Sequence, residues 1–396
     1  MRPALLIYCQ HSMGLGHLVR SWAIADALSA TFRVVFVSGG EPPAGMTSPP
    51  GVEMVHLPAL QQTTAGEIVT AASDGGVAEI QQRRRARLRE TFTAVNPDVL
   101  VVELFPFGRA KFADEIVPIL ELARARRPRP LVACSVRDLL AGGRKNQQQH
   151  DDRARFLADR YFDAVLVHAD PRLARLEETF KPATPLQVPV LYTGFVTAAQ
   201  TPQPGPSGPR SGVVVSAGGG RVGGPLLRAA ADAQKLAPRS EREPMRIVTG
   251  PFLPDQEFAD LIARVEGETD IAVERSVPSL RPLLAGAAVS ISQCGYNTAL
   301  ELLQLRVPAL VVPFADGRED EQRARARRLA ALNSVRVLDP DDLCAERLAE
   351  AMGAMREFRP EPLMLDIDGA RATRDAIEAL YPALGLAGVL EAGLAS

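Results

Sequence analysis

One candidate for acid–base chemistry lies just after the first apolar run of the sequence. His17 ends the segment QHSMGLGH, in which Gly14 and Gly16 let the backbone turn sharply and leave room for a ligand. His11 lies in the same loop and competes for the same role. This segment alone is equally compatible with a His17 that only caps a helix or faces solvent.

A carboxylate that could serve such a histidine ends a later apolar run, in the segment VVELFPFG. Beside a ligand cleft, Glu103 could hold an imidazole in one tautomer and raise its basicity. Taken by itself, Glu103 is more commonly explained as an ordinary charge at the edge of a sheet.

A glycine-rich segment, VVVSAGGGRVGG, contains Gly218, Gly219 and Gly220. An apolar run that enters a glycine-rich turn before a helix often presents backbone N–H groups to phosphate. The segment is not a P-loop, because no Gly-Lys-Ser/Thr follows, and it does not match the dinucleotide-binding fingerprint well. It predicts phosphate binding without naming the ligand.

The segment VSISQCGYNTALELL predicts an anion site at the start of a helix. Ser292, Asn297 and Thr298, with the free amides of the first turn, could bind an anion after the turn through Gly295. Glu301 falls one helical turn beyond Asn297. This spacing suits amides on a diphosphate and a carboxylate on a ribose diol. The alternative is that Asn297 and Thr298 merely cap the helix.

Two series of apolar runs would position these residues. Each run is nearly continuous, as expected for parallel strands covered on both faces, and the intervening segments have helical patterns. The Pro- and Gly-rich segment 197–212 separates the two series. We therefore expect an α/β protein with two doubly wound, Rossmann-like domains that face each other across a cleft. The expected strands are 4–9, 33–38, 52–57, 99–104, 131–135, 164–168, 213–216, 246–249, 271–274, 288–292 and 309–312.

The predicted boundaries are an N-terminal domain over 1–196, a linker over 197–212, a C-terminal domain over 213–367, and a closing helix and tail over 368–396. The closing helix could pack against either domain. A chain of 396 residues is long enough for two substantial cores.

Composition excludes several classes of function. The formal net charge of −2 gives no overall attraction to nucleic acid or to an anionic membrane. The four cysteines are scattered, which fits neither a disulfide framework nor a zinc site. No apolar run is long enough for a transmembrane helix or a signal-peptide core, so a cytoplasmic location is expected.

The segment from Ser292 to Glu301 resembles the donor-site signature of GT-B glycosyltransferases of the family that includes the bacterial lipid II-forming N-acetylglucosaminyltransferase. In that family a Ser-x-x-Gly-x-x-Thr-x-x-Glu segment binds the nucleotide-sugar, and Ser292, Gly295, Thr298 and Glu301 match it position by position.

The following residues extend the resemblance through RVPALVVPF and DGREDEQ. In the family, residues just after the Pro-Phe strand contact the hydroxyls of the sugar. Glu321 and Gln322 occupy those places here. The family more often has two glutamines, so Glu321 is a departure that leaves the donor sugar open.

The N-terminal GLGH is similar to the GxGH turn of inverting GT-B enzymes. The resemblance implies that His17 is the general base and that Glu103 orients it, in place of the more usual aspartate. It also implies that the N-terminal domain binds the acceptor and that the C-terminal domain binds the nucleotide-sugar.

The implied activity is that of an inverting, metal-independent glycosyltransferase of the hexosyltransferase class. It would move a sugar from a nucleoside-diphosphate sugar, with UDP favoured, to a hydroxyl of a small-molecule or lipid-linked acceptor, without a cofactor. A nucleotide-sugar hydrolase or epimerase of the same fold and a non-catalytic nucleotide-sugar-binding protein remain alternatives.

Two basic runs, QQRRRARLRE and ARARRPRP, lie in the N-terminal half. Related enzymes that act on lipid-linked acceptors carry apolar and basic patches on that domain. A charge run is usually a solvated helix face, so peripheral membrane contact is the less favoured interpretation.

Overall fold

The computed structural model describes residues 2–11, 16–40, 46–62, 67–70, 76–140, 146–197, 208–314 and 321–393. These residues form two compact units. The first contains the described residues up to Leu140, those between Arg144 and Ala199, and those from Leu365 onward. The second contains the described residues between Gln200 and Met364.

The first unit is built on a seven-stranded sheet in which all neighbouring strands are parallel. The strand order reverses at β1: the chain first adds β2 and β3 on one side of β1, and later adds β6 and the strands after it on the other side. In an open parallel sheet the crevice at such a reversal is where ligands bind. From edge to edge the strands are β3 (Val52–His56), β2 (Arg33–Ser38), β1 (Ala4–Cys9), β6 (Val99–Glu103), β7 (Leu131–Arg137), β8 (Ala164–His168) and β9 (Val190–Tyr192).

Helices cover both faces of this sheet, which is why its central strands are nearly continuous apolar runs. One face packs against α1 (Gly16–Ser29) and α12 (Gly369–Gly393), whose Leu18, Trp22 and Ile377 belong to one buried cluster with strand residues. On the other face, side chains of α2 (Val77–Val95) and α3 (Ala113–Ala125) surround residues of β1 and β6. The remaining elements are β4 (Leu60–Gln62), β5 (Ile68–Thr70), α4 (Gln147–Tyr161), α5 (Leu176–Thr179) and the short helix η1 (Ala110–Phe112).

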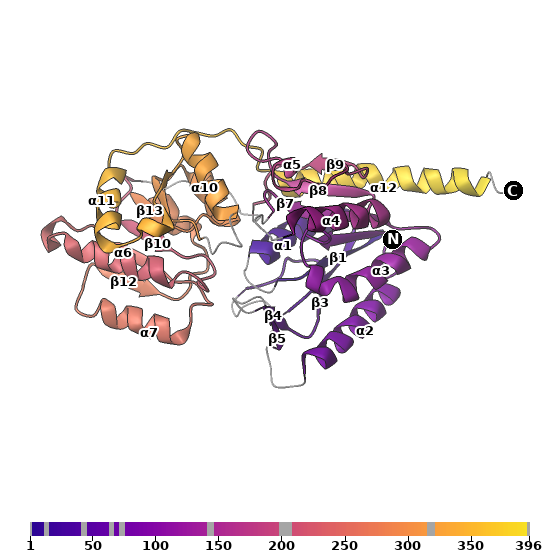
Figure 1. Cartoon of the computed structure of the whole chain (residues 1–396), viewed down its shortest axis with the longest axis horizontal. Helices are drawn as coiled ribbons and strands as arrows, with labels where there is room; N and C mark the ends of the chain where they lie inside the picture. The colour runs from indigo at the N-terminus through magenta and orange to yellow at the C-terminus, as the bar shows by residue number, and fades with distance from the viewer. Residues whose placement is uncertain are drawn as a thin grey trace. The chain divides into compact units, whose positions relative to one another are not determined.

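The last helix of the chain belongs to the first unit. Ile377 of α12 is fully buried among residues of α1 and the sheet, and Glu378 accepts a hydrogen bond from the Thr31 hydroxyl. Of the two partners that the sequence left open for the closing helix, the structure selects the N-terminal one (Figure 1).

The second unit has the same type of architecture and is built on a six-stranded parallel sheet. Here the order reverses on either side of β10, which lies between β11 and β13. In edge-to-edge order the strands are β12 (Ile271–Glu274), β11 (Met245–Val248), β10 (Val213–Ser216), β13 (Val289–Ser292), β14 (Ala309–Val311) and β15 (Arg336–Val337).

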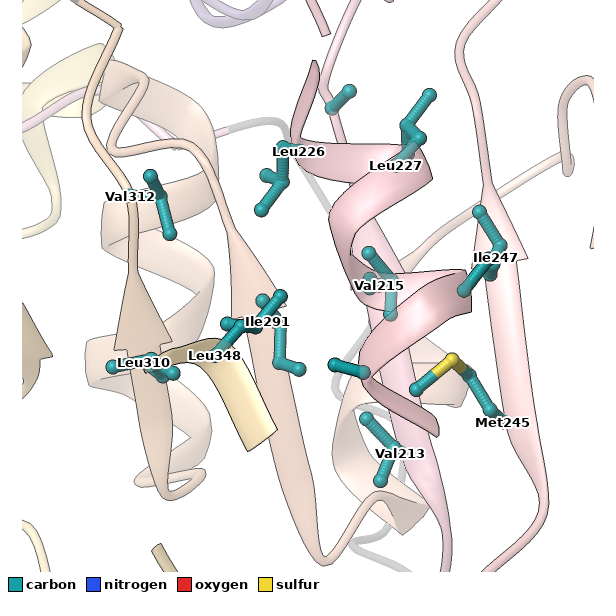
Figure 2. Packing of buried hydrophobic residues seen from close by; sticks show 14 of the residues in the cluster. Val213, Val215, Leu226, Leu227, Met245, Ile247, Ile291, Leu310, Val312 and Leu348 are labelled. Atoms are coloured by element: carbon teal, nitrogen blue, oxygen red, sulfur yellow. The ribbon is translucent and has the colours of Figure 1, made fainter. Parts of the chain in front are cut away.

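The core of the second unit forms where alternate strand residues meet two helices on one face of the sheet (Figure 2). Leu226 and Leu227 of α6 (Gly224–Leu236) and Leu348 of α11 (Ala345–Met355) pack against Val215 and Ile291. The other elements are α7 (Asp255–Arg264), α8 (Arg281–Gly286), α9 (Tyr296–Leu305), α10 (Glu321–Ala331) and the short helices η2 (Arg239–Glu241) and η3 (Pro340–Asp342).

All eleven strands expected from the sequence are present, with ends that differ by at most two residues. The expectation was wrong in omitting β4, β5, β9 and β15, each of which has only two or three residues. Such short segments carry too little hydrophobic pattern to be recognised. Residues 198–207 of the expected linker lie outside the described residues. Within the described part of the chain, no helix has the length and apolar character needed to span a membrane.

Candidate functional site

His17 and Glu103 meet at the strand-order reversal of the first sheet. His17 is the second residue of α1, which follows β1, and Glu103 is the last residue of β6. The carboxyl ends of adjacent parallel strands lie at the same edge, so the fold brings together residues far apart in sequence. His17 Nδ1 lies 2.5 Å from Glu103 Oε1.

This contact sets the tautomer of the imidazole. A carboxylate only accepts hydrogen bonds, so Nδ1 carries the proton and Nε2 keeps its lone pair. Glu103 is fully buried, whereas 16% of the His17 side chain is exposed. The imidazole is therefore held at one nitrogen and can act as a base at the other.

Burial lowers the pKa of His17 below its ordinary value, Glu103 raises it in part, and Arg109 and Arg137 lower it further. Although burial opposes ionisation of Glu103, its interactions with His17 and with the guanidinium of Arg109 lower the pKa of its carboxyl. Glu103 is therefore a carboxylate and His17 a neutral imidazole at neutral pH, the states that a general base and its orienting partner require.

Arginine side chains lie around this pair, and they were not predicted from the sequence. Arg20 Nη2 lies 2.6 Å from Glu103 Oε1, and its side chain is only 1% exposed. Arg109 Nε lies 3.5 Å from Glu103 Oε2. Arg20 could have been found, because it falls one helical turn after His17. Arg109 follows an irregular loop, and no sequence pattern marks it.

His11 occupies a different environment from His17. Its Nε2 lies 2.8 Å from the hydroxyl oxygen of Ser38, which in turn donates a hydrogen bond to the carbonyl oxygen of Gly40. Burial lowers the pKa of His11 to about 4. His11 thus contacts a hydroxyl at the end of β2, whereas His17 contacts a carboxylate. Gly16 is the first residue of α1, and Gly14 lies outside the described residues.

In the second unit the two predicted phosphate segments also meet at the strand-order reversal. The last residues of β10 and β13, Ser216 and Ser292, are register partners, so the turns that follow them begin side by side. Gln293 Nε2 donates a hydrogen bond to the carbonyl oxygen of Val222 and ties the two turns together. The hydroxyls of both serines are buried and have no hydrogen-bond partner among the described residues.

The three glycines of the first turn, which follows β10, differ in their backbone conformation and in the space around them. Gly218 has φ +58° and nothing within 4 Å of an added Cβ, so its backbone faces open space. Gly220 has φ +90°, and a Cβ there would lie 2.5 Å from the carbonyl oxygen of Thr249. Gly219 has room for a side chain against Phe252. Gly220 is therefore needed for packing, and Gly218 leaves space where a ligand could approach.

The second turn leads directly into α9. Gly295 is its N-cap, with φ −64° and no side-chain capping hydrogen bond, and Asn297 and Thr298 lie inside the first helical turn. They do not cap the helix, which removes that explanation for these residues. An added Cβ at Gly295 would meet nothing within 4 Å, and its φ is open to any residue. The backbone itself therefore does not require glycine here.

Glu301 lies one turn along α9 from Asn297 and is partly buried. Burial raises the pKa of its carboxyl to about 6, and the nearby charge of Arg281 offsets part of that effect. A carboxyl group in such a place accepts a hydrogen bond from a ligand more strongly when ionised than when protonated.

Helix α10 contacts the second turn, which follows β13. Arg325, only 4% exposed, donates a hydrogen bond of 2.7 Å to the carbonyl oxygen of Cys294 and lies over the ring of Tyr296. Glu321 and Gln322 begin the same helix, and Gln322 Oε1 accepts a hydrogen bond from the amide of Phe314. No sequence pattern distinguishes the buried Arg325 from its exposed neighbour Arg327 in the same helix.

No group of histidine, cysteine and acidic residues suited to hold a metal ion occurs among the described residues. The acidic residues of the segment 315–320 lie outside them.

The C-terminal part of the chain has the most specific similarity to known proteins. Residues 214–379 match the family described as Glycosyltransferase family 28 C-terminal domain. A relative from Chromohalobacter salexigens, a UDP-N-acetylglucosamine--N-acetylmuramyl-(pentapeptide) pyrophosphoryl-undecaprenol N-acetylglucosamine transferase, is 29% identical over 44% of this chain and 46% of its own length. The chain thus spans about half the length of the curated relatives that it matches.

Solved structures extend the similarity to nearly the whole chain. Acinetobacter baumannii MurG matches with a TM-score of 0.54 and 14% identity over 97% of this chain and 99% of its own. A UDP-glucosyltransferase from Polygonum tinctorium matches with a TM-score of 0.59 and 16% identity over 97% of this chain and 94% of its own. The chain as a whole therefore has the GT-B fold of these solved structures, and its residues 214–379 are similar to the glycosyltransferase family 28 C-terminal domains.

Proposed function

We propose that this protein is an inverting, metal-independent glycosyltransferase that moves a hexosyl group from a nucleoside-diphosphate sugar, UDP-linked by preference, to an acceptor hydroxyl. The observation that carries the proposal is the contact of 2.5 Å between His17 Nδ1 and Glu103 Oε1. It leaves a neutral imidazole with a free Nε2 at the place in the first sheet where ligands bind.

In the proposed reaction, His17 Nε2 takes the proton of the acceptor hydroxyl as its oxygen bonds to the anomeric carbon. The bond from that carbon to the phosphate oxygen breaks, and the nucleoside diphosphate leaves with the electron pair. Attack opposite to the leaving group inverts the anomeric configuration. Glu103 stabilises the imidazolium that forms.

The donor would bind in the second unit. Support comes from the adjoining turns after β10 and β13, where Gly218 leaves space and the first-turn amides of α9 offer positive potential to a diphosphate. Ser292, Gly295 and Thr298 would contact the phosphates, and Glu301 the ribose diol. Glu321 and Gln322 would contact the hydroxyls of the sugar. A small-molecule or lipid-linked acceptor would bind to the first unit.

A panel of nucleotides and nucleotide-sugars in a thermal-shift assay tests donor binding, since a specific ligand raises the melting temperature. Turnover is then measured with and without candidate acceptor alcohols. Transfer with inverted configuration supports the proposal. Consumption of donor that no acceptor affects would instead indicate a hydrolase or an epimerase, and binding without turnover would indicate a binding protein.

The histidines provide the sharpest test of the mechanism. His17→Ala should lower the rate about 10²–10⁴-fold, the usual cost of losing a general base, and leave nucleotide affinity unchanged. His11→Ala is the matched control from the same loop and should retain most of the activity. Loss of turnover in His11→Ala but not in His17→Ala would show that His11 is the base.

A further inference from the structure

Two guanidinium groups, those of Arg20 and Arg109, lie beside the single negative charge of Glu103, whose Oε2 has no hydrogen-bond partner among the described residues. Its Oε1 already receives hydrogen bonds from His17 and from Arg20, at 2.5 and 2.6 Å. Arg109 reaches only the other oxygen, at 3.5 Å, a distance too long for a good hydrogen bond. One carboxylate thus faces two guanidinium groups, of which Arg20 is the closer partner.

Arg109 has hydrogen-bonding capacity that no described residue uses. Its side chain is 12% exposed, and its Nε and Nη2 atoms are buried without a hydrogen-bond partner among the described residues. A buried donor without a partner destabilises the folded state, and the effect is larger for a charged group. A ligand that offers acceptor oxygens to Nε and Nη2 would remove this penalty.

The backbone holds Arg109 in this position at some conformational cost. Both Arg109 and Leu104 have left-handed backbones, with φ +59° and +63°. A non-glycine residue is uncommon in this region, and such residues gather at functional sites. The loop after Glu103 therefore turns back so that Arg109 lies beside the carboxylate.

Arg109 is also close to the proposed base. Its charge lowers the pKa of the His17 imidazole, as does the charge of Arg137 at the end of β7. A group bound by Arg109 would therefore lie near His17 and near an acceptor hydroxyl that His17 deprotonates.

We propose that Arg109 binds an anionic group of the acceptor, a phosphate or a carboxylate, beside His17. The planar fork of a guanidinium matches two oxygens of either anion, and the surplus of positive charge favours an anion over a neutral amide or alcohol. The proposal rests on the proposed function, because that function makes His17 the group that faces the acceptor. It narrows the acceptor to a hydroxyl compound that bears a negative charge.

The test uses the full-length chain and inorganic phosphate or acetate as the probe. The chain has five histidines, so their ring protons are few enough to follow by NMR, and the resonance missing from His17→Gln identifies His17. Each anion is titrated against chloride at constant ionic strength. We expect a saturable shift of the His17 resonance as phosphate or acetate binds.

Arg109→Gln should weaken this binding about tenfold or more, as expected for a lost charge-assisted hydrogen bond. Arg109→Lys keeps the charge without the fork and should bind with intermediate affinity. The matched control is Arg85→Gln, since Arg85 is an exposed arginine of α2 in the same unit, and it should bind like the wild type. The other four histidine resonances report whether each variant is folded.

The proposal is overturned if neither anion shifts the His17 resonance saturably, or if the affinity is the same in Arg109→Gln. If Arg109→Gln does not fold, wild-type affinity in Arg109→Lys overturns it.

Nucleotide binding is measured on the same samples, so a failed anion site with intact nucleotide binding refutes this inference alone. Anion binding that depends on Arg109, without any nucleotide binding, refutes the proposed function.

Discussion

Replacement of Glu103 by glutamine separates the structural role of this carboxylate from its role in catalysis. The side chain keeps its shape and loses its charge. Glu103 is fully buried and accepts short hydrogen bonds from His17 and Arg20. The change removes the negative charge with which the buried guanidinium of Arg20 pairs. It also removes both influences of Glu103 that raise the pKa of His17, its charge and its hydrogen bond.

Each loss has an expected magnitude. Breaking a buried ion pair by removing one partner typically lowers the free energy of unfolding by about 3–5 kcal/mol. The amide of a glutamine can present either its oxygen or its nitrogen to His17 Nδ1, so the imidazole is no longer held in one tautomer. With the base misoriented and less basic, the rate of transfer should fall about 10²–10⁴-fold.

Glu115→Gln is the matched control. Glu115 is buried in the same unit and pairs with Arg84 at 2.7 and 2.9 Å, and it makes no hydrogen bond or ion pair with His17 or Glu103 among the described residues. Urea unfolding should show a comparable loss of stability in both variants. Only Glu103→Gln should lose transfer rate, and calorimetry should give both variants wild-type nucleotide affinity, because the proposed nucleotide site belongs to the other unit.

Two results would refute this reasoning. If Glu103→Gln transfers sugar at the wild-type rate while stable, then Glu103 does not orient the base. If Glu115→Gln loses as much rate as Glu103→Gln, the effect follows from lost stability, and the catalytic role of the pair is not needed to explain it.

Three further predictions concern the proposed donor site and the leaving group. Because burial raises the pKa of Glu301 to about 6, nucleotide affinity should fall as the pH drops through that value and the carboxylate is protonated. Glu301→Gln should bind about tenfold or more weakly at pH 8 and lack this pH dependence in calorimetry. Both proteins share the titration of the nucleotide's own phosphate, so identical pH profiles would exclude Glu301 from the contact. Gly295→Val should fold normally, since its φ is unstrained and nothing lies within 4 Å of an added Cβ, and should lose donor binding because the side chain enters the ligand space. Normal donor binding by this variant would make the turn purely structural. Turnover should survive EDTA, because the amides of the α9 N-terminus are proposed to stabilise the leaving group. Loss of turnover that magnesium or manganese restores would contradict the mechanism.

Much of the fold was predictable because parallel strands covered on both faces are continuous apolar runs. Strands β1, β2, β8, β10 and β12 begin and end where the sequence predicts. The position of His17 at the start of a helix also follows from local features, since glycines precede it and a helical apolar face, Leu18, Trp22, Ala25 and Leu28, continues from it.

The segment proposed to bind the donor was recognisable because its residues are close in sequence. Ser292, Gly295, Thr298 and Glu301 keep their spacing in any strand–turn–helix unit, so a linear pattern records their geometry. The same sequence did not reveal Arg325, because its contact with Cys294 joins residues 31 positions apart. A buried arginine in an arginine-rich helix has the same local pattern as an exposed one.

The sequence by itself determined eleven of the strands, the turns that follow them and the residue types available at each turn. Only the tertiary structure decided that His17 rather than His11 contacts Glu103, and that Arg20 and Arg109 gather around the same carboxylate. His17 and Glu103 are 86 residues apart, and they meet because β6 pairs with β1 on the side opposite β2. Strand order depends on how whole layers of helices pack against a sheet, and no local run of residues specifies it.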